Sequence, residues 1–523
     1  MWSTAEQAKL GMIGLYNPTR HAGSYHRNCV CDGYTQYAFV WGSGFDDCGC
    51  RYFVNNAATT GYGVFSRKWL DDYTGVQACN LAIEKLPQMN REELPEDQLK
   101  SYLGEAHFLR AMYYFDLLTY YSGHKDNDPG IPLYTTMPAM EESDVPRSTP
   151  KEVRELMISD LKIAIDGLAF KPYEKGRASR AAALGMLGKV YLYADDYSNA
   201  AATFRQLISE NSQQSSKFSL YSDYAKLFTL AGENNSEYMF VIDCIADNGY
   251  GSYIDLLYSN RSANCSGTST SIPTNFLAES YLMKDGTPYE WDPDLNWQDR
   301  DAVNAMFAQR DPRLEASIIR PYGLFTGKNS VVYEFRPVDG VKKPYPSLQS
   351  GANTAYYHYL WRKFCNTGNE TTTRRHSPTD IPIMRWGDIL LLAAEAINEA
   401  EGPKAEVYDL LDQIRNRAGM PTMDRAALST KEALRTAIRN ERVYELAGEG
   451  WMYPDWQRWY AHNDADFKYY VENQKVYSAD HKYVLPLQQV STRTFQKRNW
   501  RYAIPKTQME VSTKLVQSEG WVD

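Results

Sequence analysis

The sequence predicts a mainly α-helical protein, in which paired helices of the tetratricopeptide type form a scaffold beneath long irregular insertions. Three observations predict this class. Apolar residues recur at helical spacing between positions 389 and 400, and a helix-turn-helix pair fills positions 177–210. Ser, Asn, Gly and aromatic residues dominate positions 211–380, where we expect only a few short strands.

The first long helix is predicted over positions 101–122. Apolar residues cover almost every side of it, which is typical of a helix buried between others. They are Leu103, Ala106, Leu109, Met112, Tyr113, Leu117, Leu118 and Tyr121. Positions 151–168 predict a more amphipathic helix. Ser148 or Thr149 would cap its start, and Pro150 fits the first turn because a residue there needs no helical N–H bond.

Two helices of similar size follow in positions 177–210. The first carries Leu187 and Val190, the second carries Phe204 and Leu207, and a turn at positions 195–197 separates them. The pair is close to the period of about 34 residues that tetratricopeptide repeats show. We therefore expect these helices to belong to a stacked scaffold.

A second helical pair is predicted between positions 385 and 418, which is about the size of the first. Ile389, Leu392, Ala393, Ala396, Ile397 and Ala400 lie along one face of its first helix. Gly402-Pro403 allows a tight turn, and Val407, Leu410, Leu411 and Ile414 mark the partner helix. Gly419 and Pro421 end that partner.

A third helix of this region carries Leu434, Ala437, Ile438 and Leu446. Glu441, Glu445 and Glu449 recur along it at every fourth position, which places their carboxylates on one face. Arg442 and Arg458 are available as partners, so we interpret these acids as a structural network.

The chain of 523 residues is expected to form one large unit. Its scaffold would lie mainly in positions 70–210 and 380–460, and its insertions in about 20–68 and 211–380. Tyr238 to Ile242 and Val331 to Phe335 are short apolar runs that predict small strands. Loops held on rigid helices often carry binding groups, so the two insertions are where function is expected.

Composition and charge exclude several classes of protein. A hydrophobic content of 43% with 23% charged residues is typical of a globular chain. A net charge of −9 argues against a nucleic-acid partner, because phosphate binding requires clustered Lys and Arg. No apolar stretch reaches the roughly 18 to 20 residues that span a bilayer. With 40 Tyr against 18 Phe, many rings carry a polar group suited to a wet surface.

The eight cysteines and one acidic loop bear on metals and disulfides. Cys29-Val30-Cys31 and Cys48-Gly49-Cys50 are spaced too tightly for the usual zinc knuckle, so disulfides are the favoured use if the protein leaves the cytoplasm. Asp292 to Asn296 begins like a calcium loop. Trp297 then stands where such a loop needs glycine, and Val303 where it needs glutamate, so no metal or cofactor is predicted.

Several motifs together carry a resemblance to a known family. Asp380 to Trp386, Ala394 to Glu399 and Ile414 to Gly419 resemble, in order and spacing, the SusD/RagB family of bacterial outer-membrane glycan-binding lipoproteins. Further matching stretches are Glu105 to Asp116, Pro273-Thr274, Met283 to Gly286, Arg310 to Leu314, Glu441-Arg442, Glu445-Leu446, Glu449-Gly450, Asp455 to Trp459, Ile504-Pro505 and Gly520-Trp521. Met452, Pro454 and Glu519 depart from the family pattern. The resemblance covers nearly the whole chain.

The resemblance implies a non-catalytic protein exposed at the surface of the outer membrane, where it captures an oligosaccharide or polysaccharide. It implies a SusC-like TonB-dependent transporter as partner. It also implies a membrane link only through a lipid on a cysteine upstream of Met1, after a signal peptide. The residues that follow Met1 show no such peptide, so we expect the printed chain to begin after it.

A glycan site needs aromatic rings for the CH faces of sugars, beside amides and carboxylates for their hydroxyl groups. Both insertions supply these residue types. The candidate contacts are Tyr34, Tyr37, Trp41, Tyr52 and Asn55 in the first insertion, and Tyr289, Trp291, Trp297 and Trp361 in the second. Their number and spread predict a shallow aromatic platform.

Two other functions remain as alternatives. A glycoside hydrolase needs two carboxylates that face each other across a sugar, and no pair lies in a diagnostic motif. No Gly-rich phosphate loop, nucleophile elbow or His-Glu-x-x-His stretch occurs. A peptide-binding tetratricopeptide adaptor would explain the helices but not the aromatic insertions.

Overall fold

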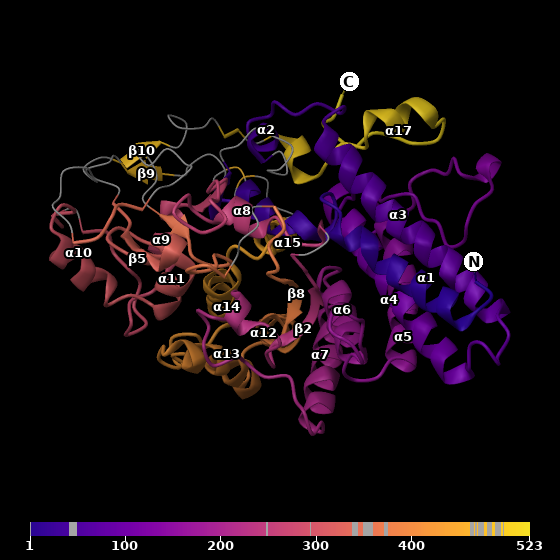
Figure 1. The fold of residues 1–523 in the computed structure, drawn as a ribbon, viewed down its shortest axis with the longest axis horizontal. Coiled ribbons are helices and arrows are strands. Elements are labelled where there is room, and N and C mark those ends of the chain that lie inside the picture. The colour runs from indigo at the N-terminus through magenta and orange to yellow at the C-terminus, as the bar shows by residue number, and fades with distance from the viewer. Residues whose placement is uncertain are drawn as a thin grey trace.

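The structure is a computed structural model. It describes residues 2–40, 50–246, 249–292, 294–336, 344–348, 359–370, 375–460, 465, 468, 475–477, 484–486, 493–494 and 496–522. Helices predominate, as the sequence predicts (Figure 1). The longer ones are α1 (Ala5–Tyr16), α3 (Gly63–Lys85), α4 (Glu96–Tyr121), α5 (Pro150–Gly167), α6 (Arg180–Leu192), α7 (Tyr197–Ser212), α12 (Trp386–Glu401), α13 (Ala405–Ala418), α14 (Lys431–Leu446) and α15 (Met452–Tyr460).

Helices that follow each other in the chain pack side by side. α4 lies between α3 and α5, and α6 packs on both α5 and α7. α7 then contacts α12, although about 170 residues separate them in the chain, and α12 contacts α13 and α14. This stacking of helical pairs is the tetratricopeptide-like scaffold expected from the sequence (Figure 1).

The ends of the scaffold helices follow local chemistry. The Thr149 side chain accepts the backbone N–H of Glu152, and the Glu152 carboxylate accepts that of Thr149, so Thr149 rather than Ser148 is the cap of α5. Asp196 caps α7 in the same way, at the predicted turn. Gly419 ends α13 with a positive φ of 73°, which a residue without Cβ adopts at little cost.

A two-stranded sheet joins the two halves of the scaffold. The predicted strand β2 (Tyr238–Ile242) pairs antiparallel with β8 (Ile381–Arg385), and β8 leads directly into α12. The pairing anchors the start of α12 beside α6, which contacts β2. The expected strand near Val331 is also present, as β6 (Val332–Glu334), paired with β5 (Leu324–Thr326).

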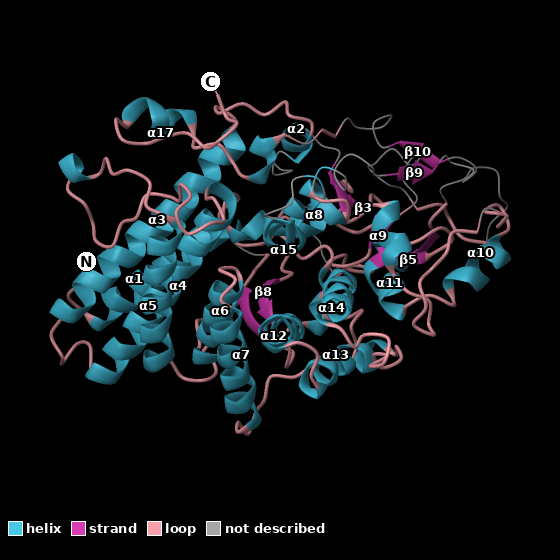
Figure 2. Ribbon diagram, turned by 180° about the vertical axis from the view of Figure 1, so that it is seen from behind, coloured by secondary structure: helices cyan, strands magenta, loops and turns pink. Residues whose placement is uncertain are grey.

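Backbone pairing also connects the two insertions. Strand β1 (Ala38–Val40) of the first pairs antiparallel with β3 (Ser271–Pro273) of the second. Figure 2 shows the strands as short pieces among loops and short helices. The remaining elements are the 3-10 helices η1 (Asn17–Arg20), η2 (Tyr25–Tyr34), η4 (Leu86–Gln88), η5 (Met140–Glu142), η6 (Leu230–Gly232), η8 (Lys328–Ser330) and η10 (Lys497–Trp500), the helices α2 (Cys50–Val54), α8 (Ile254–Tyr258), α9 (Asn275–Ser280), α10 (Arg300–Phe307), α11 (Pro312–Ser317) and α17 (Lys506–Val511), and the strands β4 (Ile318–Ile319), β7 (Leu360–Trp361), β9 (Lys475–Tyr477) and β10 (Val484–Pro486).

One hydrophobic core runs through the scaffold and reaches beneath both insertions. Cys29, Cys79, Cys244, Cys265 and Cys365 are buried free thiols within it, so the favoured use of cysteines in disulfides does not apply to these five. Among the described residues, no helix combines the length and apolarity that crossing a bilayer requires.

Candidate functional site

Four candidate glycan contacts lie in the core, and this corrects the expectation that they form a platform. Tyr34, Tyr37, Trp297 and Trp361 are all buried. The Trp361 indole stacks on Tyr258 with ring centroids 5.5 Å apart and donates a hydrogen bond to the Ser271 hydroxyl at 3.1 Å. Rings enclosed in this way stabilise the fold and offer no face to a sugar.

Tyr34 shows why sequence alone assigned these rings wrongly to the surface. Its ring contacts Tyr453 at 4.8 Å, and its hydroxyl lies 2.5 Å from that of Tyr502. Both partners are more than 400 residues away in the chain. Trp41, another candidate, lies outside the described residues.

The clearest surface ring among the remaining candidates is Trp291. Its indole is half-buried and stacks almost parallel on the buried Trp297, with centroids 5.3 Å apart and planes at 15°. Trp297 is itself fixed, because the Tyr322 hydroxyl donates to its carbonyl at 2.9 Å and the Phe307 ring lies 6.2 Å away. The exposed part of Trp291 therefore rests on a rigid support.

Tyr289 lies two residues before Trp291 and is also half-buried. The Arg310 guanidinium carbon lies 3.7 Å from the centroid of its ring. Arg310 in turn donates to the carbonyls of Ala278 and Tyr281, each at 2.8 Å. Tyr289 and Trp291 are thus two adjacent aromatic side chains on a loop that the core holds in place.

Tyr52 and Asn55 form a separate group at α2. The Tyr52 ring contacts Tyr62 edge to face at 5.5 Å, and the Asn55 side-chain oxygen accepts the backbone N–H of Ala57 at 3.0 Å. Figure 1 shows α2 well apart from α10, the helix that follows Trp291 in the chain. The described residues therefore present two candidate surfaces, not one compact site.

The acids Glu441, Glu445 and Glu449 lie in a buried ion-pair network, which confirms their structural interpretation. Glu441 contacts Arg313 at 2.6 Å, and Glu449 contacts Lys363 at 2.9 Å. Because α14 ends at Leu446, Glu449 stands in the following turn and not on the helix. We name this group the Glu445 cluster. Its members are Glu237, Asp311, Arg313, Lys363, Arg385, Arg415, Arg417, Glu441, Glu445 and Glu449.

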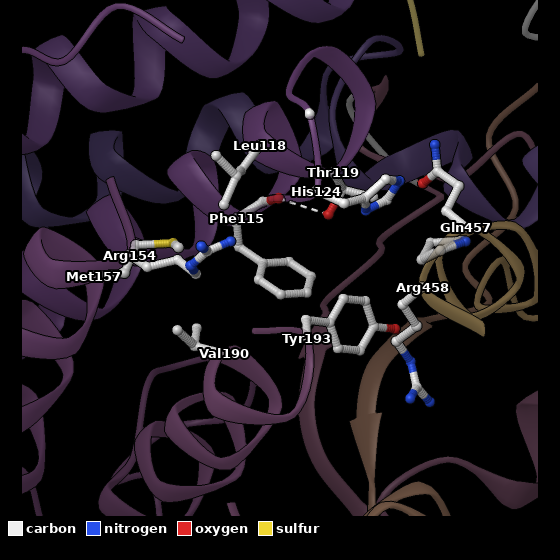
Figure 3. Close-up of a pocket in the computed structure, with 12 residues that line it drawn as sticks. Phe115, Leu118, Thr119, His124, Arg154, Met157, Val190, Tyr193, Gln457 and Arg458 are labelled. Atoms are coloured by element: carbon white, nitrogen blue, oxygen red, sulfur yellow. Dashed lines mark hydrogen bonds between the residues drawn. The ribbon is translucent and has the colours of Figure 1, made fainter. Parts of the chain in front are cut away.

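A hollow of about 470 Å³ lies where α4, α5, α6 and α15 meet (Figure 3). Phe115, Leu118, Met157, Val190 and Tyr193 supply apolar walls. Thr119, His124, Arg154, Gln457 and Arg458 add polar groups. No local pattern in the sequence predicted it, because part of its lining comes from α15, which lies about 260 residues after the consecutive helices α4, α5 and α6.

A metal site is not evident in the part of the chain that the structure describes, where no three His, Cys, Asp or Glu side chains are grouped to hold an ion. In the acidic loop, the Asp292 carboxylate accepts the backbone N–H of Asp294 at 2.9 Å. The Asn296 amide accepts that of Gln298 at 3.1 Å. These side chains cap their own turns.

Two family profiles match the chain. The profile of the SusD family matches residues 236–521. A profile described as "Starch-binding associating with outer membrane" matches residues 11–192. The two matches together cover most of the chain and leave out residues 1–10, 193–235 and 522–523.

Known proteins similar to the chain include a curated relative and several solved structures. SusD-like protein P38 of Formosa agariphila is 24% identical over 87% of this chain and 84% of its own length. A SusD-like carbohydrate binding protein from Bacteroides fragilis has a TM-score of 0.79 and 22% identity, over 98% of this chain and 99% of its own. A laminarin binding SusD-like protein has a TM-score of 0.72 and 22% identity, over 99% and 100%.

Proposed function

The chain belongs to the SusD family, and on that premise we propose that it is a non-catalytic protein that binds an oligosaccharide or polysaccharide. Its structural neighbours include a SusD-like carbohydrate binding protein and a laminarin binding SusD-like protein, which supports this class of ligand. So does the starch-binding description of the second matching profile.

The observation that carries the proposal is the placement of Trp291. A half-exposed indole, held by a parallel stack on a core tryptophan, can meet the CH face of a pyranose without having to be ordered first. Tyr289, two residues earlier on the same loop, is a second half-buried ring that we include in the platform. The exposed side chains of Asp292 and Gln298 supply acceptors and donors for hydroxyl groups.

Tyr52 and Asn55 are proposed as a second part of the platform. They lie on the first insertion, whose backbone is tied to the second through β1 and β3. A polysaccharide is long enough to contact both groups, whereas a single sugar unit is not. Trp41 stays a candidate on the same insertion.

The paired state of the most regularly spaced acids supports a non-catalytic role. Retaining or inverting hydrolysis needs an acid and a base, or a nucleophile, on opposite sides of a sugar. Glu441, Glu445 and Glu449 are buried and paired with Arg or Lys. Their charges are engaged in ion pairs that hold the fold together.

We further propose that the protein acts at the outer surface of the outer membrane and passes its glycan to a SusC-like TonB-dependent transporter. In this proposal a lipid anchor holds it there. The outer-membrane wording of the second profile supports the location, and family membership supports the partner. Co-purification with such a transporter from an outer membrane would test this step.

The test of glycan binding is affinity electrophoresis of wild type and Trp291→Ala in gels with starch, laminarin and a panel of plant, microbial and host polysaccharides. We expect one of them to retard the wild type. Trp291→Ala should bind more weakly by about 1 to 2 kcal/mol, roughly five- to thirtyfold. Trp2→Ala is the matched control, because Trp2 is also half-buried and lies near the N-terminus, far from α10 (Figure 1).

Several outcomes would contradict the proposal. Equal retardation of Trp291→Ala and wild type would remove Trp291 from the site. Absence of retardation by every polysaccharide, with capture of a peptide from a library, would favour the adaptor function. Shortened products after incubation with the retarding polysaccharide would make the protein a hydrolase.

A further inference from the structure

A second hollow, distinct from the proposed platform, lies beside α1 and η1. It is open to solvent, and the space within it, part of which is that open solvent, amounts to about 700 Å³. Three segments that are separate in the sequence line it, the first of which spans two elements. They are the end of α1 with η1, residues 174–177 and the end of β2 with Asp243.

Two exposed tyrosines lie next to residues that line this hollow. Tyr173 directly precedes the lining residues 174–177 and is 60% exposed. Tyr250 is 52% exposed, and its ring lies 4.7 Å from the guanidinium carbon of the lining residue Arg20. Exposed tyrosine rings next to the charged lining of one hollow are the feature that points to a ligand.

The ring of Tyr173 is held in position from below. Its hydroxyl donates to the Glu105 carboxylate at 3.0 Å, and the same carboxylate accepts the Tyr16 hydroxyl at 2.5 Å. Arg177 donates to Glu105 at 3.2 Å and lies over both tyrosine rings. Because Glu105 is fully buried, this arrangement fixes an exposed ring before any ligand arrives.

The polar lining has both signs of charge. Lys175 pairs with Asp243 at 2.9 Å and Asp380 at 2.6 Å, which fixes the Asp243 carboxylate at the rim. Among the described residues, Arg20 has no carboxylate within ion-pair distance. Its guanidinium therefore keeps donors for a ligand, and Asp243 and Glu174 keep acceptors.

We propose that this hollow is a second saccharide site, in which one or two sugar units lie between Tyr173 and Tyr250 and bond to Arg20 and Asp243. The inference rests on the proposed glycan-binding function and extends it to a second point of contact on the same chain. Paired hydroxyl groups of a sugar match a guanidinium or a carboxylate, and its CH face matches a tyrosine ring. A peptide would instead favour a continuous apolar groove, which these charges interrupt.

The test is isothermal titration calorimetry, in which the full chain is titrated with hexasaccharides derived from starch, laminarin, cellulose, xylan, mannan and polygalacturonate. We expect two binding events for at least one of them. The double variant Tyr173→Ala/Tyr250→Ala should abolish one event, and Arg20→Ala should weaken the same event by about tenfold or more. Tyr173→Phe keeps the ring but loses the hydrogen bond to Glu105 that fixes it, so it should weaken the same event less than the double variant does.

A matched control is available for the loss of Arg20. Arg425 is also a surface arginine over a tyrosine, and its guanidinium carbon lies 5.3 Å from the centroid of the Tyr408 ring. It belongs to the segment that follows α13 in the chain. Arg425→Ala removes the same charge and should leave both events intact. Far-ultraviolet circular dichroism checks that every variant is folded.

The outcomes separate this inference from the proposed platform. If the double tyrosine variant binds like the wild type while Trp291→Ala loses binding, the second site is overturned and the platform stands. If only the double variant loses binding, the second site stands and the Trp291 platform is overturned. If no hexasaccharide binds, or a peptide binds here instead, the second site is overturned.

Discussion

Single residues show how this protein keeps charges in its core. Glu445 is fully buried, and three arginines surround its carboxylate, namely Arg313 at 3.3 Å, Arg385 at 2.8 Å and Arg417. Burial alone would raise the pKa of Glu445, but the positive charges of these arginines outweigh it and hold the pKa well below its usual range. The carboxylate therefore stays ionised and binds three segments of the chain.

Removing this one charge tests the cluster. Glu445→Gln keeps the size of the side chain but leaves the buried arginines short of one anion, so we expect a loss of about 3 to 5 kcal/mol in the free energy of unfolding. Denaturation by guanidinium chloride measures it. Glu401→Gln is the control, since Glu401 pairs with Arg205 at the surface and should cost about 1 kcal/mol or less. Similar losses in both variants would show that the cluster adds no stability.

The residues of this cluster also mark a limit of sequence analysis. The spacing of Glu441, Glu445 and Glu449 predicted a structural network, but their main partners were not Arg442 and Arg458. Those two arginines instead bind Asp455, Arg442 at 2.6 Å and Arg458 at 2.9 Å. Ion pairs across a fold depend on which helices meet, and local spacing does not contain that information.

At the scale of elements, the first insertion is locked onto the turn between α14 and α15. The carboxylate of Asp32, in η2, accepts the backbone N–H groups of Gly448 at 2.8 Å and Met452 at 3.1 Å. Gly450 lies between them with φ of 89°, and a Cβ there would come within 2.5 Å of the Asn28 carbonyl. The close backbone approach therefore requires glycine at position 450.

A glycine pair tests this contact between elements. Gly450→Ala adds a methyl group in a strained conformation with no space, and we expect a loss of about 2 to 4 kcal/mol in the free energy of unfolding. Gly14→Ala is the control. Gly14 lies inside α1, where a Cβ would meet nothing within 4 Å, so alanine should stabilise the protein by up to about 1 kcal/mol. Urea denaturation of both variants measures the difference. An unchanged free energy of unfolding in Gly450→Ala would contradict the close approach of the Gly450 backbone to Asn28.

Elements differ in how far the sequence predicts them. The scaffold helices follow from periodicity and caps, because α5, α7 and α13 begin or end at residues whose local chemistry is visible in the chain. Strand β8 was not predicted, since its partner β2 lies about 140 residues upstream. Burial of Tyr34 and Trp361 was missed for the same reason, because rings are enclosed by distant segments.

At the scale of the whole molecule, several buried or partly buried carboxylates among the described residues have pKa values shifted in opposite directions, so they respond oppositely to pH. Burial opposes ionisation of Asp455, but Arg442 and Arg458 outweigh it and lower its pKa to about 2, and the pKa of Glu395 and Asp388 is lowered as well. Burial, with the nearby Asp380 carboxylate, raises the pKa of Glu233 to about 7. Burial also raises the pKa of Asp32 to about 7.

The signs of these shifts predict a stability maximum in mildly acidic solution. A lowered pKa means that the unfolded chain binds more protons between about pH 4 and pH 2, so stability falls as the solution is acidified through that window. A raised pKa means that the folded protein binds more protons between about pH 4 and pH 7, so stability falls as pH rises through it. Each group changes the free energy of unfolding by at most about 1.4 kcal/mol per pH unit.

Thermal unfolding across this range should therefore give a higher midpoint near pH 5 than near pH 7.5, with a steep fall below about pH 4. Glu233→Gln removes one group with a raised pKa while keeping its shape. The midpoint temperature should then fall less between about pH 5 and pH 7, and its fall in acid below about pH 4 should be unchanged. Asp455→Asn should instead make the midpoint temperature fall less steeply below about pH 4. A midpoint that rises steadily from acid to neutral pH would mean that Glu233 and Asp32 ionise as readily in the folded protein as in the unfolded chain.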